Sequence, residues 1–225
     1  GVAVSNWRLA RAVSELGHLG VVSGTCLDTV LIRRLADGDP GGHVRKALEA
    51  FPVPRVAQDV LDRFFQPTGR EEGEAYPLLP MYRHVVSEFK QQVTVLANFV
   101  EVFLAKHGHD GQVGINLLTK VQMPNLPSLY GAILAGVDYV LMGAGIPKDI
   151  PQALEKLSKH LPASIRLDVE GCGQAQAVEI EFDPSGFWDD DPPQLERPRF
   201  LPIIASNSLA TMLARKASGP VDGFI

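Results

Sequence analysis

Residues Val113–Gly145 read VGINLLTKVQMPNLPSLYGAILAGVDYVLMGAG, and two kinds of pattern alternate along them. Val113–Leu118 is a short apolar run of the kind that forms a buried strand. A helical pattern follows at Leu126–Ala135 and ends at Gly136, a residue type that often terminates helices. A second apolar run covers Tyr139–Met142. A strand, a helix and a strand in this order indicate a parallel sheet covered by helices.

The same alternation continues on both sides of this stretch. Before it, we expect a helix that Ser5 or Asn6 caps and that ends near Leu16 before Gly17, then a strand at Leu19–Ser23, and then helical residues from Leu27 to Ala50 interrupted near Gly38–Gly42. After it, we expect a helix at Ile150–His160, a strand at Leu201–Ala205, a helix at Ser208–Lys216 and a further strand from Gly223. Apolar strands that alternate with helices are typical of α/β proteins.

Residues 51–110 contain no convincing strand of this sheet. They read as a short helix at Val56–Phe65, a polar loop rich in Gly and Pro at Gln66–Pro80 and a long helix at Val85–Lys106. We interpret them as a helical insertion in one domain, and a separate small helical domain is the alternative.

Residues 163–199 read as a second insertion. Ile165–Val169 and Val178–Phe182 each alternate polar and apolar residues, as the two strands of a hairpin do. A loop rich in Pro and Asp follows at residues 186–199.

The strands fit either an open parallel sheet or a closed barrel, and periodicity does not distinguish the two. We count four barrel-type strands and the start of a fifth, whereas a complete (β/α)8 barrel has eight strands and about 250 residues. The chain begins at Gly1 without Met, and its last residues, VDGFI, read as the opening of a buried strand. We therefore expect both ends to be cuts, and residues 1–225 to form an incomplete (β/α)8 TIM barrel.

The composition is that of a soluble globular protein, with 45% hydrophobic and 21% charged residues. The formal net charge of −5 implies no general attraction to nucleic acid or to an anionic membrane surface. No apolar run approaches the roughly 20 residues of a membrane helix. Two cysteines in unlike contexts predict no disulfide framework, so we expect a cytoplasmic protein.

Most residues that could bind a cofactor or a metal are explained better by a structural role. Gly143-Ala144-Gly145 lacks the third glycine of a dinucleotide-binding loop and reads as a tight turn. His107 and His109 could hold a metal, but a solvated helix end explains them better. Trp188 and the following Asp189–Asp191 read as a solvated loop. No metal site is therefore assigned.

The two cysteines also receive structural interpretations. Cys26 follows a strand end, where barrel enzymes place reactive groups, yet a buried small apolar residue is the better interpretation. Cys172, between Gly171 and Gly173, reads as part of a hairpin turn. We expect the two thiols to be neither catalytic nor bonded to each other.

Asn116 stands out because it places a polar side chain inside an apolar strand. An amide both donates and accepts hydrogen bonds, which suits the mixed donors and acceptors at the edge of a flavin ring. An asparagine that supports a loop backbone is the alternative, and the residue pattern by itself does not separate the two.

Five ordered segments resemble the nitronate monooxygenase (2-nitropropane dioxygenase-like) family, and they extend along nearly the whole chain. They are Gly1–Ser5 (GVAVS), Leu19–Gly24 (LGVVSG), Val113–Leu117 (VGINL), Gly136–Pro147 (GVDYVLMGAGIP), and Leu201–Ser206 (LPIIAS) with Gly223–Ile225 (GFI). This family is a (β/α) barrel that binds FMN and oxidises alkyl nitronates with oxygen. A related branch reduces enoyl thioesters with a nicotinamide coenzyme in polyketide and polyunsaturated fatty acid synthesis.

The resemblance implies a role for particular residues. Asn116 matches the family asparagine that contacts FMN, Gly1 and Val2 match the end of a loop that passes near the flavin, and Met142 and Gly143 match a strand end that lines the cavity. The family's Gly-Gly-His loop, with its catalytic histidine, and the glycine loops that hold the FMN phosphate would follow the last residue. No catalytic residue is therefore assigned, and residues 1–225 alone are expected to bind FMN weakly and to be inactive.

The resemblance thus implies a flavoprotein oxidoreductase that acts on a small molecule, either a nitronate or an enoyl thioester. A non-catalytic barrel that serves as a scaffold is an alternative of a different class, because a fold does not imply a function. A Gly-Gly-His segment and glycine-rich phosphate loops in the complete gene would favour the enzyme.

Overall fold

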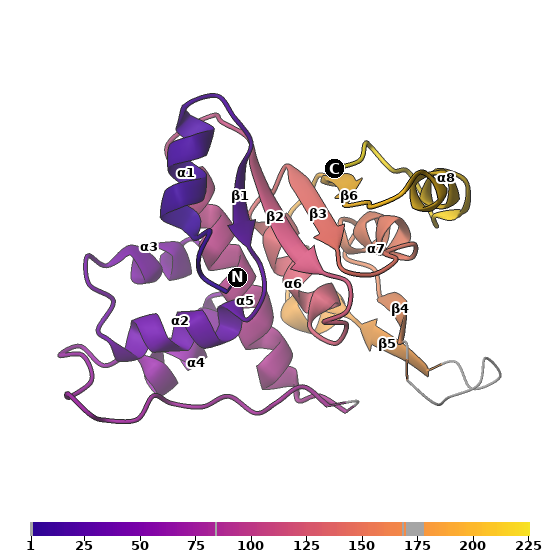
Figure 1. Cartoon of the computed structure of the whole chain (residues 1–225). Helices are drawn as coiled ribbons and strands as arrows, with labels where there is room; N and C mark the ends of the chain where they lie inside the picture. Colours follow the sequence, from indigo (N-terminus) through magenta and orange to yellow (C-terminus); the bar gives the residue numbers. More distant parts are fainter. Residues whose placement is uncertain (1, 84, 168, 170–177) are drawn as a thin grey trace.

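The computed structural model describes residues 2–83, 85–167, 169 and 178–225, in which helices and strands alternate along most of the chain (Figure 1). The helices are α1 (Trp7–Glu15), α2 (Leu27–Ala36), α3 (His43–Glu49), α4 (Pro54–Phe64), α5 (Glu88–Lys106), α6 (Asn125–Leu134), α7 (Ile150–Leu157), the 3-10 helix η2 (Pro184–Phe187) and α8 (Asn207–Lys216). The strands are β1 (Gly20–Ser23), β2 (Val113–Leu118), β3 (Tyr139–Gly143), β4 (Ala163–Leu167), β5 (Val178–Phe182) and β6 (Arg199–Pro202).

Four strands form one parallel sheet in the order β1-β2-β3-β6. The register aligns Val22, Ile115, Val140 and Phe200 in a row across the sheet, and none of these side chains is exposed. Helices α1, α5 and α6 pack against the sheet, and Figure 1 shows α5 and α6 behind it. The predicted mixed α/β class with a parallel sheet is therefore confirmed, and the described strands form an open sheet.

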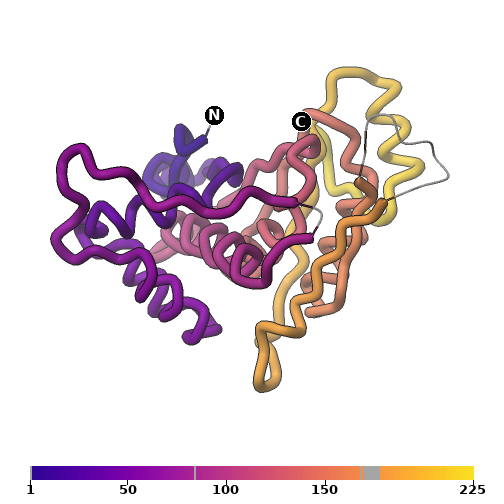
Figure 2. The backbone as a smooth tube through the Cα atoms, turned by 90° about the horizontal axis from the view of Figure 1, so that it is seen from below, coloured from indigo at the N-terminus to yellow at the C-terminus, as the bar shows by residue number. Residues whose placement is uncertain are grey.

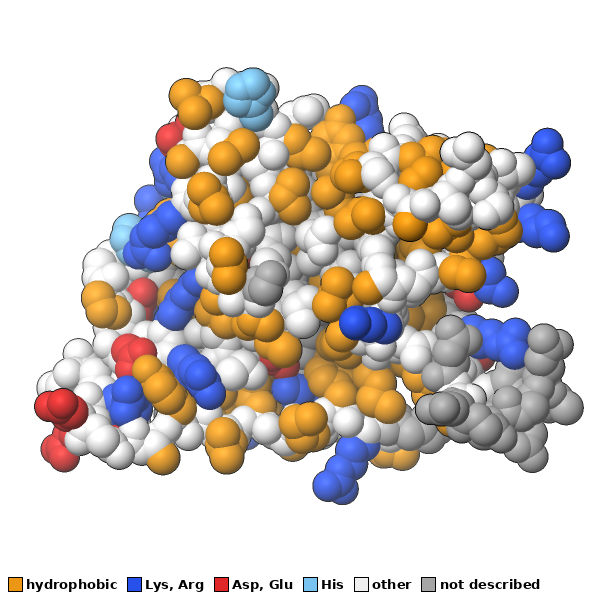
Figure 3. Space-filling view, in the orientation of Figure 1, with side chains coloured by type: hydrophobic (Ala, Val, Ile, Leu, Met, Phe, Trp, Pro, Cys, Tyr) orange, Lys and Arg blue, Asp and Glu red, His pale blue; other side chains and the backbone are white. Residues whose placement is uncertain are grey.

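The opposite face of the sheet is less covered. Its side chains include Val21, Ser23, Asn116 and Leu201, all of which are partly exposed. In the part of the chain that the structure describes, no helix lies in front of β2 and β3 (Figure 1). Figure 3 shows hydrophobic side chains at the surface over the centre of this view. The sheet therefore has a helix-covered face and an open face.

Irregular segments extend the sheet at both edges. Beside β1, the amide of Ser23 donates to the carbonyl oxygen of Ser5 over 2.8 Å. Beside β6, the amide of Asp222 donates to Phe200 O over 3.0 Å, and the amide of Ile225 donates to Pro202 O over 3.1 Å. The strand expected from Gly223 is thus a segment that pairs with β6 without forming a regular strand.

The predicted position of β6 was wrong by about two residues. The expectation placed this strand at Leu201–Ala205, whereas it spans Arg199–Pro202. The cause is that β6 pairs with β3. This pairing begins at Arg199, whose amide donates to Asp138 O over 2.9 Å. A charged residue at the start of the strand conceals this pairing in the sequence.

Helix α5 is the centre of the helical part, because it packs against α1, α2, α3, α4, α6, β1 and β2. It begins at Glu88 rather than at the expected Val85, since the hydroxyl of Ser87 caps it by accepting from the amide of Lys90. Helices α5 and α6 approach so closely that a Cβ on Gly131 would lie 2.0 Å from the carbonyl oxygen of Val95. The helices of residues 51–110 thus share a core with the sheet.

Strands β4 and β5 form an antiparallel hairpin as predicted, with Ile165 paired to Ile180. Strand β4 spans Ala163–Leu167 rather than the expected Ile165–Val169, because its pairing begins where Ala163 lies opposite Phe182. Figure 2 shows this hairpin on the side of the molecule away from α2, α3 and α4. The turn predicted at Cys172 lies outside the described residues. None of the described helices has the length and apolar character that crossing a membrane requires.

Candidate functional site

The carboxyl ends of the parallel strands meet at one edge of the sheet, which is where α/β proteins most often bind ligands. Asn116 lies near this edge on the open face, between Ser23 of β1 and Leu141 of β3. Its carbonyl oxygen accepts a hydrogen bond from the amide of Gly24 over 2.9 Å. Within the described residues, nothing hydrogen bonds to the side-chain amide of Asn116, so that group is available to a ligand.

Met142 and Gly143 lie on the neighbouring strand, opposite Leu117 and Leu118 of β2. The side chain of Met142 is completely buried on the helix-covered face, so only its backbone lies near the strand ends. A Cβ on Gly143 would lie 3.0 Å from Cβ of Ile203, so the absent side chain makes room for that residue. Both positions are close to Asn116, but neither presents a side chain to the open face.

Val2 and Gly1 precede α1. Val2 is about half exposed, with 49% of its surface accessible, and Gly1 lies outside the described residues. The structure therefore brings together Asn116, Met142 and Gly143 on adjacent strands, and it leaves Val2 at the surface.

A cavity of about 230 Å³ lies near the same edge, on the helix-covered side of the sheet. We call it the Lys90 cavity; its walls come from the loop after β1, the start of α2, residues 79–82, α5, and the segment between β2 and α6. Inside it, the ammonium group of Lys90 lies 2.5 Å from Oδ2 of Asp28 and 5.1 Å from the ring centroid of Tyr82. The Tyr82 hydroxyl lies 2.6 Å from the Thr94 hydroxyl, and burial raises the pKa of Tyr82.

Cys26 lines the Lys90 cavity, and the expectation that it is buried was wrong. The chain turns sharply after β1, and Cys26 adopts the left-handed conformation with φ of 59° just before α2, which leaves the residue exposed. Partial enclosure of the thiol raises its pKa. The carboxylate of Asp28 raises this pKa further, whereas the ammonium of Lys90 lowers it.

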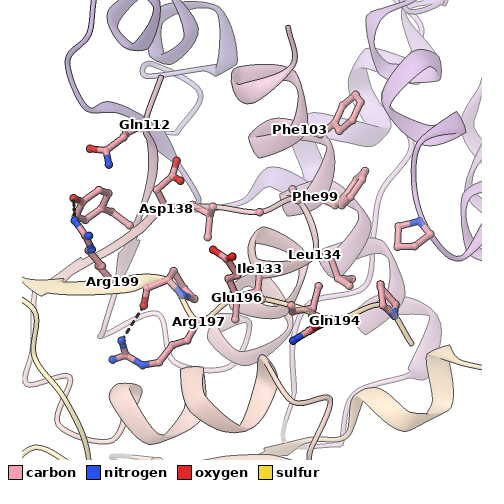
Figure 4. Close-up of a pocket in the computed structure, with 18 of the residues that line it drawn as sticks. Phe99, Phe103, Gln112, Ile133, Leu134, Asp138, Gln194, Glu196, Arg197 and Arg199 are labelled. Atoms are coloured by element: carbon pink, nitrogen blue, oxygen red, sulfur yellow. Dashed lines mark hydrogen bonds between the residues drawn. The ribbon is translucent and has the colours of Figure 1, made fainter. Parts of the chain in front are cut away.

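A larger cavity of about 630 Å³ lies at the amino edge of the sheet (Figure 4). In its wall, Asp138 accepts from Lys106 Nζ over 2.6 Å and from the Val113 amide over 2.7 Å. Arg199 donates to the Tyr139 hydroxyl over 2.7 Å. These charged groups hold the starts of strands in place, as residues at the amino face of parallel α/β structures commonly do. The carboxyl edge is therefore the better candidate for function.

The loop predicted around Trp188 is only partly solvated. Asp189–Asp191 are exposed as expected, but Trp188 is half-buried and its indole N–H donates to the Tyr130 hydroxyl over 2.7 Å. The same hydroxyl lies 2.7 Å from Nδ1 of His160, whose Nε2 lies 2.7 Å from Pro193 O. The expectation missed this cluster because its three side chains are far apart in the sequence.

His107 and His109 lie at the carboxyl end of α5, as the helix-end interpretation predicts. His107 is exposed at the helix end, and Nε2 of His109 lies 2.6 Å from Ala105 O. In the described ranges, no group of three or more His, Cys, Asp or Glu side chains is arranged to hold a metal ion.

The sequence reasoning also missed Asp28, Lys90 and Asn98. The signal for part of this set is a polar stripe on α5, because Lys90, Thr94 and Asn98 recur at intervals of four residues and therefore lie on one side of the helix. All three residues are buried and line the Lys90 cavity.

Comparisons with known proteins gave no match to a family model, to a curated protein or to a solved structure. The resemblance to nitronate monooxygenases stays a prediction from the sequence.

Proposed function

We propose that this chain is part of an FMN-dependent oxidoreductase of the nitronate monooxygenase type, with the flavin at the carboxyl edge of the parallel sheet. In this proposal, β1, β2, β3 and β6 contribute to a (β/α)8 barrel. The observation that carries it is the position of Asn116, whose free side-chain amide lies near the strand ends on the open face.

The surroundings of Asn116 fit one edge of a flavin ring. An amide offers both a donor and an acceptor, and Ser23 adds a hydroxyl on the same face of the neighbouring strand. On the other side, Leu141 and Leu201 continue the row with apolar side chains against which a planar ring could rest. When bound, FMN would accept electrons from the substrate, while these residues would orient the ring and exclude water from it.

The open face supports the barrel part of the proposal. Parallel sheets are usually buried on both faces, and in a (β/α)8 barrel the inner face is buried by side chains of the other strands. The partly exposed apolar residues Val21, Leu118 and Leu201 have this inward position.

The test is FMN binding by the protein that the complete gene encodes. We expect Asn116→Ala to raise the FMN dissociation constant by about 5- to 150-fold, which corresponds to a loss of about 1–3 kcal/mol for an unsatisfied polar partner. Asn207→Ala is the matched control, because Asn207 is exposed on α8 and should leave the constant unchanged. An unchanged constant in Asn116→Ala would refute the assignment of this residue.

The choice of substrate is tested separately in the flavin-loaded protein. Oxygen consumption with an alkyl nitronate supports the monooxygenase, and oxidation of a nicotinamide coenzyme with an enoyl thioester supports the reductase. A protein that binds no flavin and has neither activity would support the scaffold alternative instead.

A further inference from the structure

Asn98 lies in the wall of the Lys90 cavity and carries a buried hydrogen-bond acceptor. Only 1% of its surface is exposed. Its Nδ2 donates to the carbonyl oxygen of Thr94 over 2.9 Å, which fixes the orientation of the amide and leaves Oδ1 as an acceptor. No donor in the described part of the chain reaches this oxygen. Buried acceptors are nearly always satisfied, so this oxygen calls for a donor that the described residues do not supply.

The rest of the wall restricts the other properties of a ligand. Leu79, Met81, Leu117, Val121 and Pro124 provide apolar surface. The ammonium of Lys90 and the carboxylate of Asp28 neutralise each other, so the cavity offers no net charge to a charged molecule.

The volume of the cavity restricts the size of the ligand. A cavity of about 150 Å³ admits benzene, whereas sites for drug-sized ligands have about 300–1,000 Å³. At about 230 Å³, the Lys90 cavity suits one ring with a small substituent.

We propose that the Lys90 cavity binds a small, neutral, single-ring molecule with one O–H or N–H donor, which hydrogen bonds to Oδ1 of Asn98. This site is distinct from the proposed flavin site, because it lies on the helix-covered side of the sheet, whereas Asn116 faces the open side. The two sites are neighbours, since the Gly24 amide in the cavity wall donates to Asn116 O. Binding does not require FMN, so the two proposals fail independently.

The test compares two probes that differ by the donor, phenol and toluene. Each is titrated into the whole chain while the backbone amide signals are followed by NMR. We expect phenol to shift the signals of residues 24–29 and 94–98 and to bind at least about tenfold more tightly than toluene. Equal affinities, or phenol shifts that map to another part of the protein, would overturn the proposal.

A variant identifies the acceptor. Asn98→Leu keeps a similar side-chain shape and removes Oδ1, so we expect the preference for phenol to disappear and toluene to bind at least as well. A retained preference in a folded variant would refute the role of Asn98.

A second measurement covers the case in which Asn98→Leu does not fold. In the Cys172→Ser background, phenol should slow the alkylation of Cys26, which lines the same cavity, and toluene should do so only at higher concentration. Identical protection by the two probes would overturn the proposal without any change at Asn98.

Discussion

The ammonium nitrogen of Lys90 lies 2.5 Å from Oδ2 of Asp28, and this ion pair joins α5 to the first turn of α2 with 6% and 10% of the two side chains exposed. Loss of one member leaves the other as an uncompensated buried charge. We expect Lys90→Met to lower the free energy of unfolding by about 3–5 kcal/mol. Chemical denaturation at neutral pH measures the effect.

Two comparisons show whether burial is the cause. The double variant Lys90→Met/Asp28→Leu should be more stable than Lys90→Met, because it removes both charges. Glu15→Gln disrupts the exposed pair with Arg11 and should cost no more than about 0.5 kcal/mol. A cost for Lys90→Met as small as that for Glu15→Gln would contradict the buried pair.

The rate at which the Cys26 thiol is alkylated depends on the charges of Asp28 and Lys90. Asp28 raises the pKa of the Cys26 thiol and Lys90 lowers it. Only the thiolate is alkylated, so a higher pKa means slower alkylation at a fixed pH below it. We therefore expect the rate–pH curve for iodoacetamide to move to lower pH in Asp28→Asn and to higher pH in Lys90→Met.

The alkylation assay uses a Cys172→Ser background, so that Cys26 is the thiol whose alkylation rate is measured. Circular dichroism confirms that each variant is folded before its rate is measured. Curves that move in the same direction for both variants would show that loosening of the loop, rather than local charge, controls the thiol.

The contact between α5 and α6 is sensitive to a single methyl group. Because a Cβ at position 131 would lie 2.0 Å from Val95 O, the two helices must separate to accept it. We expect Gly131→Ala to lower the free energy of unfolding by about 1–3 kcal/mol, the usual cost of an overpacked core.

Gly186→Ala is the matched control, because a Cβ there meets no atom within 4 Å. It should change the thermal midpoint by much less than Gly131→Ala does. Equal midpoints for the two variants would show that the helices are not in close contact at this point.

The hydroxyl of Tyr130 on α6 contacts His160, which follows α7, and Trp188, which lies in the second insertion. It accepts from the Trp188 indole and contacts His160, so Tyr130→Phe leaves both without this partner. We expect Tyr130→Phe to cost about 1–3 kcal/mol of unfolding free energy. A double-mutant cycle with Trp188→Phe should give an interaction energy of at least about 0.5 kcal/mol, and additive effects would contradict the hydrogen bond.

Much of the fold follows from local patterns in the sequence. The strand at Val113–Leu118 is confirmed at both ends, the antiparallel hairpin follows from the alternation of polar and apolar residues, and the helix after Asn6 follows from its capping residue. These features depend on neighbours in the chain, which the sequence displays directly. The position of β6 did not follow, because β3 sets its register from a distant part of the chain.

The candidate site was less accessible to sequence reasoning. Asn116 was identified because one polar residue interrupts an apolar strand, and its assignment to FMN stays a prediction. Lys90 and Asp28 are 62 positions apart and each resembles an ordinary surface charge in the sequence. The exposure of Cys26 was missed because it depends on a single left-handed residue conformation after β1.

The pairing of β1 with β2 has a consequence for synthesis of the protein. Gly20 pairs with Val113, and the helices α2 to α5 lie between them in the chain, whereas β2 and β3 are separated by α6 alone. Translation proceeds at about 5–20 residues per second, so β1 leaves the ribosome roughly 5–20 s before its partner strand. During this interval the backbone N–H and C=O groups of β1 that later pair with β2 are unpaired and open to association with other chains. Slow codons or chaperone binding between the two strands would therefore affect yield more than equal changes after β3.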